Sequence, residues 1–255
     1  MEREGSIDIE RLFEPGSEAA LRSYITLLHP ADVAELFQYV EDRYWLQITV
    51  LLTPENLGEV LTHVDERYVD RLTELLRPER LAEAVEELES DDATDLLQEI
   101  DETRARDVLA ALDEEDRTEL STLLAYPDDS AGGLMQTEVC SVDYTRSVSH
   151  AIDAVRESVE VVDDVHVVYL VNQHGVLNGF VGLEALVLAS PDTPLSAISE
   201  PVEQSLTADV DQEEVARVFR KYDVAVLPVV TNDGVLVGRV TFDDIHDVIV
   251  EEATE

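Results

Sequence analysis

A proline-led phrase that recurs at an even spacing in the first half of this chain constrains its fold more than any other feature. Pro30, Pro54 and Pro78 open the similar phrases PADVAELFQYV, PENLGEVLTHV and PERLAEAVEEL. Because proline is tolerated in the first turn of a helix, each phrase predicts a helix of roughly ten residues. Repeated short helices bury their apolar stripes against their neighbours, so we expect an α-solenoid over residues 5–125.

The segments between these phrases repeat as well. VEDRYW and VDERYV recur at the same spacing as the prolines, so each repeat should contain a pair of helices. Trp45, Tyr39 and Tyr44 fall in this region, and we expect them to pack between helices. The residues before the first phrase, from Ile9 to Leu28, predict one or two further helices.

The second half of the chain contains two copies of a different pattern, one after the other. VVYLVNQHGVLNGFVGLEAL aligns with VAVLPVVTNDGVLVGRVTFDDI, so Gly175 and Gly179 fall opposite Gly234 and Gly238. The short apolar runs rich in β-branched residues predict buried strands, and the glycine-containing turns predict hairpins. Each copy should therefore form a small α/β domain.

The later copy can be followed element by element. A helix is predicted from Asp211, which resembles the start of a capping box with Glu214 three residues later. Strands are predicted over residues 224–230 and 235–241, joined by the tight turn Asn-Asp-Gly. Thr241 is expected to cap a final helix with one acidic and one apolar face.

The ending of this copy, GRVTFDDI, resembles the second half of a cystathionine-β-synthase (CBS) domain pair. The earlier copy resembles its partner in degenerate form, with Gly182 and Ala185 where the later copy has Thr241 and Asp244. The expected fold is α+β multidomain: an all-α superhelix, a solenoid of short helices, followed by an α/β CBS-domain pair. The predicted domains are the solenoid at 5–125, a linker at 126–136, and CBS domains at 137–192 and 193–255.

The charge balance is extreme. The chain has 58 acidic and 17 basic residues, a formal net charge of −41, and Lys221 is its only lysine. An apolar content of 45% with clear helical periodicity argues against disorder. A folded protein covered with carboxylates repels itself in dilute buffer and is screened at molar salt, which indicates a halophilic host, an archaeon. Acidic patches are therefore weak evidence of function here, and nucleic acid and anionic lipid are disfavoured as direct partners.

The sequence contains no residue pattern that would support other classes of function. The lone Cys140 excludes an internal disulfide, fits a cytoplasmic protein and is expected to be buried. The six histidines form no i, i+4 pair, and no Ser-His-Asp order or glycine-rich phosphate loop is present, so no enzyme is predicted. The start of the chain has no apolar signal segment, and no apolar run approaches the roughly 18 residues of a membrane span.

The succession of a superhelix, the phrase YPDDSAGGLM at 126–135 and a CBS pair resembles the cytosolic region of MgtE-type magnesium transporters. The phrases at 209–217, 222–230 and 240–255 support this resemblance, which covers nearly the whole chain. The family's connecting helix and membrane pore are absent. We therefore expect either a separate pore subunit, with this chain peripheral at the inner face of the membrane, or a sensor without a pore.

The resemblance implies a Mg²⁺ sensor rather than catalysis. In such transporters, Mg²⁺ between acidic faces of the superhelix and the CBS pair favours a closed state, and its loss lets the carboxylates repel. Mg²⁺ takes oxygen ligands and keeps several waters, which suits facing carboxylates that form no complete cage. The metal residues implied by the resemblance are Glu59, Asp91, Asp95, Asp211, Glu213, Asp223, Asp244, Asp247, Glu252 and Glu255.

The resemblance to CBS pairs also implies a homodimer through these domains and ATP or AMP in the cleft between the two halves. Thr241 and Asp244 would then contact the sugar side of the nucleotide, while Val224 and Pro228 would line the base pocket. Two alternatives to the Mg²⁺ sensor stay open. One is a nucleotide sensor that regulates another partner, and the other is a solenoid docking scaffold whose acidity reflects only salt adaptation.

Overall fold

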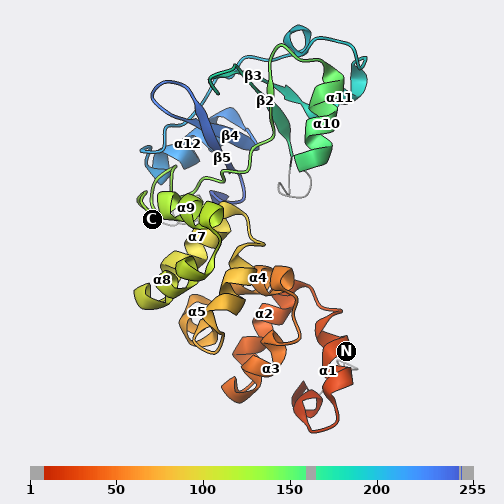
Figure 1. The fold of residues 1–255 in the computed structure, drawn as a ribbon, viewed down its shortest axis with the longest axis vertical. Coiled ribbons are helices and arrows are strands. Elements are labelled where there is room, and N and C mark those ends of the chain that lie inside the picture. The colour runs from red at the N-terminus through yellow and green to blue at the C-terminus, as the bar shows by residue number, and fades with distance from the viewer. Residues whose placement is uncertain (1–8, 159–164, 247, 249–255) are drawn as a thin grey trace. The chain divides into compact units, whose positions relative to one another are not determined.

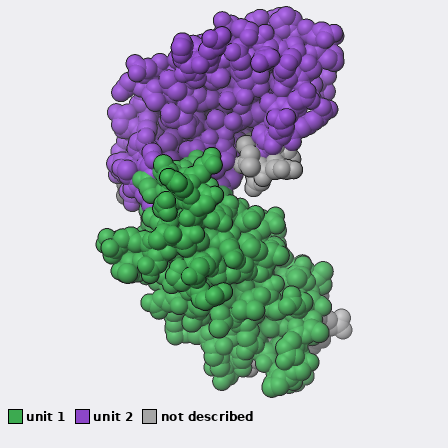
Figure 2. All heavy atoms as spheres, viewed as in Figure 1, with its two compact units in different colours: residues 1–88, 92–121 green, residues 89–91, 122–255 purple. Residues whose placement is uncertain are grey.

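The computed structural model describes residues 9–158, 165–246 and 248. The chain divides into unit 1, residues 1–88 and 92–121, and unit 2, residues 89–91 and 122–255 (Figure 2). The first unit is helical and the second contains small sheets, which confirms the predicted α+β multidomain class (Figure 1). Within the described residues, no helix combines the length and apolar character that a membrane span requires.

Short helices joined by tight turns run through the first half of the chain (Figure 1). They are η1 (Ile9–Phe13), α1 (Glu18–Ile25), α2 (Pro30–Tyr39), η2 (Asp42–Tyr44), α3 (Trp45–Thr49), α4 (Pro54–Thr62), α5 (Glu66–Thr73), α6 (Pro78–Val85), α7 (Ser90–Glu99), α8 (Glu102–Ala111) and α9 (Glu114–Leu123). Each repeated proline begins a helix, as predicted. Helix α2 packs on α4, α4 on α6 and α6 on α8, which is the stacking expected of a solenoid.

Two arginines that are one repeat apart make equivalent contacts. Arg80 Nη2 donates to the carbonyl of Leu52 in the turn after α3, at 2.6 Å. Arg104 Nη2 donates to the carbonyl of Leu76 in the turn after α5. Each guanidinium therefore satisfies a backbone carbonyl of the turn that follows a helix and ties successive repeats together.

Trp45 anchors the early part of the solenoid. It is 1% exposed, and its ring lies edge-on to Phe37 and Tyr68 at centroid distances of 5.6 and 5.7 Å. Tyr44 also packs, stacked on a phenylalanine ring at 4.4 Å. These two expectations are confirmed, but the one for Tyr39 is wrong. Its side chain is 71% exposed because the buried stripe of α2 runs along the other side of that helix.

Unit 2 contains the two copies of the strand-turn-strand pattern. Its elements are β1 (Ser141–Asp143), α10 (Val148–Ser158), β2 (Val167–Val171), β3 (Leu177–Gly182), α11 (Leu183–Leu188), η3 (Leu195–Ala197), α12 (Gln212–Tyr222), β4 (Val226–Val230) and β5 (Leu236–Thr241). In the first copy β1 pairs in parallel with β2, and β2 pairs antiparallel with β3. Helices α10 and α11 pack together beside this sheet (Figure 1). Cys140 lies in the same apolar core, as predicted.

The hairpins β2–β3 and β4–β5 have the same register. Val167 pairs with Gly182 in the first, and Val226 pairs with Thr241 in the second. Each hairpin also shifts register at the same place, before its last pair. The alignment of the two copies seen in the sequence is therefore preserved pair by pair in the structure.

The turns of the two hairpins bind each other reciprocally. Leu177 N donates to the Gly234 carbonyl at 2.9 Å, and Leu236 N donates to the Gly175 carbonyl at 3.0 Å. Both glycines have positive φ, at 74° and 79°, a conformation that glycine adopts without steric cost. Because each donor and each acceptor is matched by its aligned residue in the other copy, a local two-fold rotation relates the copies.

The AGGLM phrase of the predicted linker packs within unit 2. Ala131 N donates to the Val210 carbonyl at 2.7 Å, and Gly132 N donates to the Ala208 carbonyl at 2.9 Å. A Cβ on Gly132 would lie 2.6 Å from the ring of Tyr126. Glycine is needed here because the ring and the backbone approach so closely.

The later copy departs from the sequence reading in two details. Strand β4 begins at Val226 rather than at residue 224, because Asp223 ends α12 in a left-handed conformation with φ 52°. Asp211 caps α12, accepting from Glu213 N at 2.9 Å. Glu214 does not complete the capping box; its carboxylate accepts from Arg217 at 2.7 Å instead. The predicted final helix falls largely outside the described residues.

Candidate functional site

Residues 89–91 bring one predicted metal residue into unit 2. Asp91 is 7% exposed, and its Oδ2 accepts from Gln136 Nε2 at 3.0 Å. Beside it, Ser90 N and Oγ donate to the Glu138 carboxylate at 3.2 and 2.8 Å, and Thr137 N donates to Ser90 Oγ at 2.9 Å. This network fixes Ser90 and Asp91 against residues 136–138.

Asp244 meets Asp91 within the same unit. Asp244 Oδ2 accepts from Thr241 N and from Thr241 Oγ1, both at 2.8 Å. Burial raises the pKa of Asp244, hydrogen bonds from Thr241 lower the pKa, the charge of Asp243 raises it, and a hydrogen bond with Asp91 lowers it. Two ionised carboxylates at hydrogen-bond distance repel each other, so this pair favours a shared proton or a cation.

Gln136 completes a set of oxygen-bearing groups at this point. Its Oε1 is buried and has no hydrogen-bond partner among the described residues. Two carboxyl groups and an amide oxygen are the ligand types that Mg²⁺ prefers, with water filling its remaining positions. Over the ranges that the structure describes, no group of three or more His, Cys, Asp or Glu side chains is arranged to hold a metal, so the pair would act with Gln136 and water.

The other predicted metal residues are exposed or lie outside the described residues. Glu59 on α4 and Asp95 on α7 are exposed side chains of unit 1, and Asp95 does not share the buried position of Asp91. Three more are exposed on or beside α12: Asp211 as its N-cap, Glu213 in its first turn and Asp223 as its C-cap. Asp247, Glu252 and Glu255 lie outside the described residues.

A cleft of about 450 Å³ opens between the two copies of unit 2. Val224 and Pro228, which the resemblance to CBS pairs places in a base pocket, are among its lining residues. Thr241 and Asp244 are not in its lining; Thr241 is buried and bonds the carboxylates of Asp243 and Asp244. The predicted nucleotide residues are therefore divided between the cleft and the carboxylate pair.

The rest of the cleft lining was not identified from the sequence. Its aromatic members are Tyr169, Phe180 and Tyr222, and its carboxylates are Glu200 and Glu203. The Nζ of the only lysine lies 4.8 Å from the centroid of the Tyr222 ring. The alignment of the two copies could have pointed to Tyr169 as a lining residue, because it places Tyr169 opposite Pro228.

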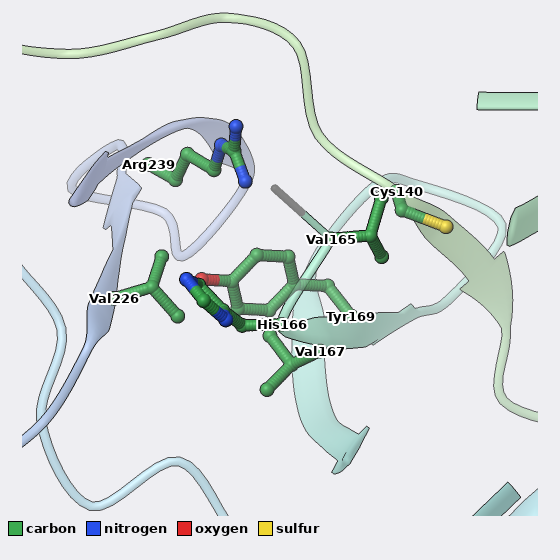
Figure 3. A pocket seen from close by; sticks show the side chains of 7 residues that line it. All are labelled: Cys140, Val165, His166, Val167, Tyr169, Val226 and Arg239. Carbon is green, nitrogen blue, oxygen red and sulfur yellow. The ribbon is translucent and has the colours of Figure 1, made fainter. Parts of the chain in front are cut away.

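A second recess lies on the other side of Tyr169 and holds only about 10 Å³, room for a single water. Figure 3 shows Arg239 from β5 and Tyr169 from β2 pointing into it, with His166 beside the phenol. Tyr169 Oη is buried and has no hydrogen-bond partner within the described residues. Burial raises the pKa of Tyr169, and the charge of Arg239 partly opposes this, so the phenol stays protonated.

Comparison with known proteins identifies the family. A model of the MgtE intracellular N domain matches residues 28–129, and a CBS-domain model matches residues 185–251. A solved structure, the cytosolic domain of the Mg²⁺ channel MgtE in complex with ATP, is 33% identical, with a TM-score of 0.89 over 94% of this chain and 98% of that one. The chain belongs to the MgtE family of magnesium transporters.

Other relatives agree with this assignment. The soluble part of a magnesium transporter superposes with a TM-score of 0.87 at 28% identity, covering 96% of both chains. MgtE of Thermus thermophilus is 39% identical over 137 residues, and MgtE of Enterococcus faecalis is 36% identical over 135. This chain spans only 30% of the length of each of these two transporters. The match confirms the predicted resemblance to the MgtE cytosolic region and the prediction that the chain is not an enzyme.

Proposed function

We propose that this chain is the Mg²⁺-sensing regulatory module of an MgtE-type transporter or channel. Mg²⁺ would bridge acidic groups of the helical region and of the CBS pair and so favour a closed state. The observation that carries this proposal is the carboxyl pair of Asp91 and Asp244 beside the buried amide of Gln136. Asp91 belongs to the first turn of a repeat helix and Asp244 to the later CBS copy, so one ion would join both parts of the sequence.

The chemistry of this pair suits a sensor rather than a permanent site. A divalent ion lets both carboxylates ionise together, whereas its loss leaves two like charges or a shared proton. With only two carboxylates, binding is weak enough to follow changes in free Mg²⁺. Occupancy can shift a conformational equilibrium because the ion binds one state better than the other.

Small-angle scattering during a MgCl₂ titration at ~2 M KCl tests the proposal, the salt being high enough to screen non-specific repulsion. We expect the radius of gyration of the wild type to fall as Mg²⁺ is added. Asp91→Asn and Asp244→Asn should abolish that response. Asp107→Asn removes one exposed carboxylate from α8 and is the matched control. A curve that does not change with Mg²⁺ would favour the scaffold alternative, and loss of the response in the control would exclude a local site.

We propose adenine-nucleotide binding in the 450 Å³ cleft as a second function. Its volume and its aromatic and apolar lining suit a flat ring with a sugar attached. The relative solved with ATP has the same fold over nearly its whole length. Val224 and Pro228 would line the base site, and the roles of Thr241 and Asp244 stay predictions. Calorimetric titration with ATP and with AMP tests this, and no heat of binding for either would reject it.

The proposed function also includes two partners for this chain. We propose a homodimer through the CBS pairs, and the membrane pore of the transporter as the structure that the module regulates at the inner face of the membrane. A halophilic host follows from the net charge of −41. Sedimentation equilibrium at ~2 M KCl tests the dimer, because screening then allows acidic surfaces to approach. A single species at the monomer mass would exclude it.

A further inference from the structure

The open cleft and the small recess are counterparts under the two-fold relation of unit 2. The alignment that places Gly175 opposite Gly234 also relates the residues that line these two spaces. It pairs recess residues with cleft residues as Val165 with Val224, His166 with Ala225, Val167 with Val226, Tyr169 with Pro228, Arg239 with Phe180 and Val226 with Val167. These six counterparts line the cleft, and the seventh recess residue, Cys140, aligns with Ser199 outside the cleft lining. The recess therefore occupies the place of a second ligand cleft.

The difference in volume between them has a cause in the side chains. In the recess, Tyr169 stands at the position aligned with Pro228 of the open cleft, and His166 stands at the position aligned with Ala225; both side chains also border the open cleft. Arg239 replaces Phe180 and extends into the recess together with the phenol (Figure 3). Tyr169 and Arg239 are 3% and 4% exposed, so their atoms fill the space that a ligand would need.

Arg239 is held in this position rather than lying loosely across the opening. Its Nη2 donates to Glu89 Oε1 at 3.2 Å, and both partners are residues of unit 2. Its backbone exchanges two hydrogen bonds with Gln136, each at 2.8 Å. Swinging the guanidinium out to admit a ligand would break this largely buried ion pair, so that movement is disfavoured.

We propose that Arg239, lying beside Tyr169, acts as a specificity-determining residue that closes the second cleft, so that each chain holds one nucleotide and not two. The inference rests on the proposed nucleotide function for the ligand class. Its geometric part, that the Arg239 side chain occupies a ligand cleft, rests only on the repeat and the two volumes. The consequence is that shortening Arg239 creates a second site for the same ligand.

Calorimetric titration of the whole chain with ATP, with and without the Arg239 side chain, tests the proposal. We expect one site in the wild type and two in Arg239→Ala, because Arg239 lines the recess and not the open cleft. Arg239→Ala/Glu89→Gln removes both charges of the ion pair, so it serves as a second opening variant if Arg239→Ala does not fold. The reverse change, Ala225→His/Pro228→Tyr, fills the open cleft and should remove the single wild-type site while circular dichroism stays unchanged.

Each outcome separates the two proposals. Two sites in the wild type, or one site in both the wild type and the folded opening variants, overturn closure by Arg239 while nucleotide binding stands. No site in the wild type rejects the nucleotide function. In that case a single site that appears only in an opening variant still supports closure, and no site in any protein overturns closure as well.

Discussion

Arg239 and Glu89 form an ion pair between residues far apart in the sequence, with Nη2 and Oε1 3.2 Å apart. The arginine side chain is 5% exposed and the glutamate 21%, so the pair is largely withdrawn from water. It fastens the residue before α7 to the middle of β5. The same arginine fills the closed cleft, so one side chain serves both contacts.

Removing the carboxylate of this pair should destabilise unit 2. Breaking a buried ion pair by deleting one partner costs about 3–5 kcal/mol, and the partial exposure of Glu89 places Glu89→Gln toward the lower end. Asp153→Asn is the control, because it removes the carboxylate of a pair with Arg156 in which both side chains are more than half exposed. Exposed ion pairs contribute little to stability, so the free energy of unfolding of this control should hardly change. Denaturant unfolding followed by circular dichroism measures both, and equal effects would contradict the buried role.

Gly58→Ala should destabilise unit 1, although alanine is the better helix former by about 1 kcal/mol. A Cβ at Gly58 would lie 2.7 Å from the Ala84 carbonyl oxygen, where α4 and α6 touch. Overpacking of this kind costs about 1–3 kcal/mol, which exceeds the gain in propensity. Gly182→Ala is the control, because no heavy atom lies within 4 Å of a Cβ there and its φ is −68°. A rise in melting temperature for Gly58→Ala would show that the helices can separate.

The stability of unit 2 should fall as pH rises through the raised pKa of Asp244. A buried carboxyl whose folded pKa exceeds its usual 3.8 binds its proton more tightly when folded. Its contribution to the stability of unit 2 is therefore fully present below pH 3.8, and it is lost as the pH rises through the pKa of the folded state. Asp244→Asn keeps an acceptor for Thr241 and has no such titration. The difference in unfolding free energy between the two proteins across this range isolates Asp244 from the other carboxylates, and parallel profiles would contradict the assignment.

Mg²⁺ should weaken that pH dependence if it binds the pair. The ion stabilises both carboxylates in their charged form, so binding releases the proton that Asp244 holds. We expect proton release on MgCl₂ addition near the raised pKa, measured as calorimetric heats that depend on the ionisation enthalpy of the buffer. Asp244→Asn should abolish this dependence. Identical proton release from the variant would place the ion elsewhere.

Neutralising the cleft carboxylates should improve binding of ATP more than binding of adenosine. Glu200 and Glu203 are exposed and line the cleft, where they repel a phosphate chain but not a neutral nucleoside. We expect Glu203→Gln to tighten ATP by about two- to fivefold, the scale of exposed charge interactions. Asp192→Asn removes the same charge outside the cleft lining and should leave affinity unchanged. Equal gains for ATP and adenosine would show that charge at this cleft is not selective.

The positions of Asp91 and Asp95 in the structure show what the sequence could not predict. Asp91 and Asp95 are four residues apart on α7, so spacing alone places both near one ion. In the structure Asp91 is buried against Gln136 while Asp95 is exposed. Helix periodicity gives the face of a residue but not the loop that covers it. Gln136 has no metal-ligand pattern in the sequence and becomes a candidate only because it is buried beside a carboxylate.

The repeating architecture could be predicted from the chain alone. Evenly spaced prolines begin successive helices, and glycines at equivalent places in the two copies form matching turns, because both residue types act on the local backbone. Which side chains of each copy form a binding site could be seen only in the folded structure. The meeting of Asp91 with Asp244 and the filling of one cleft by Arg239 join residues that lie far apart in the sequence. Such pairings depend on how side chains pack in three dimensions, which local spacing does not encode.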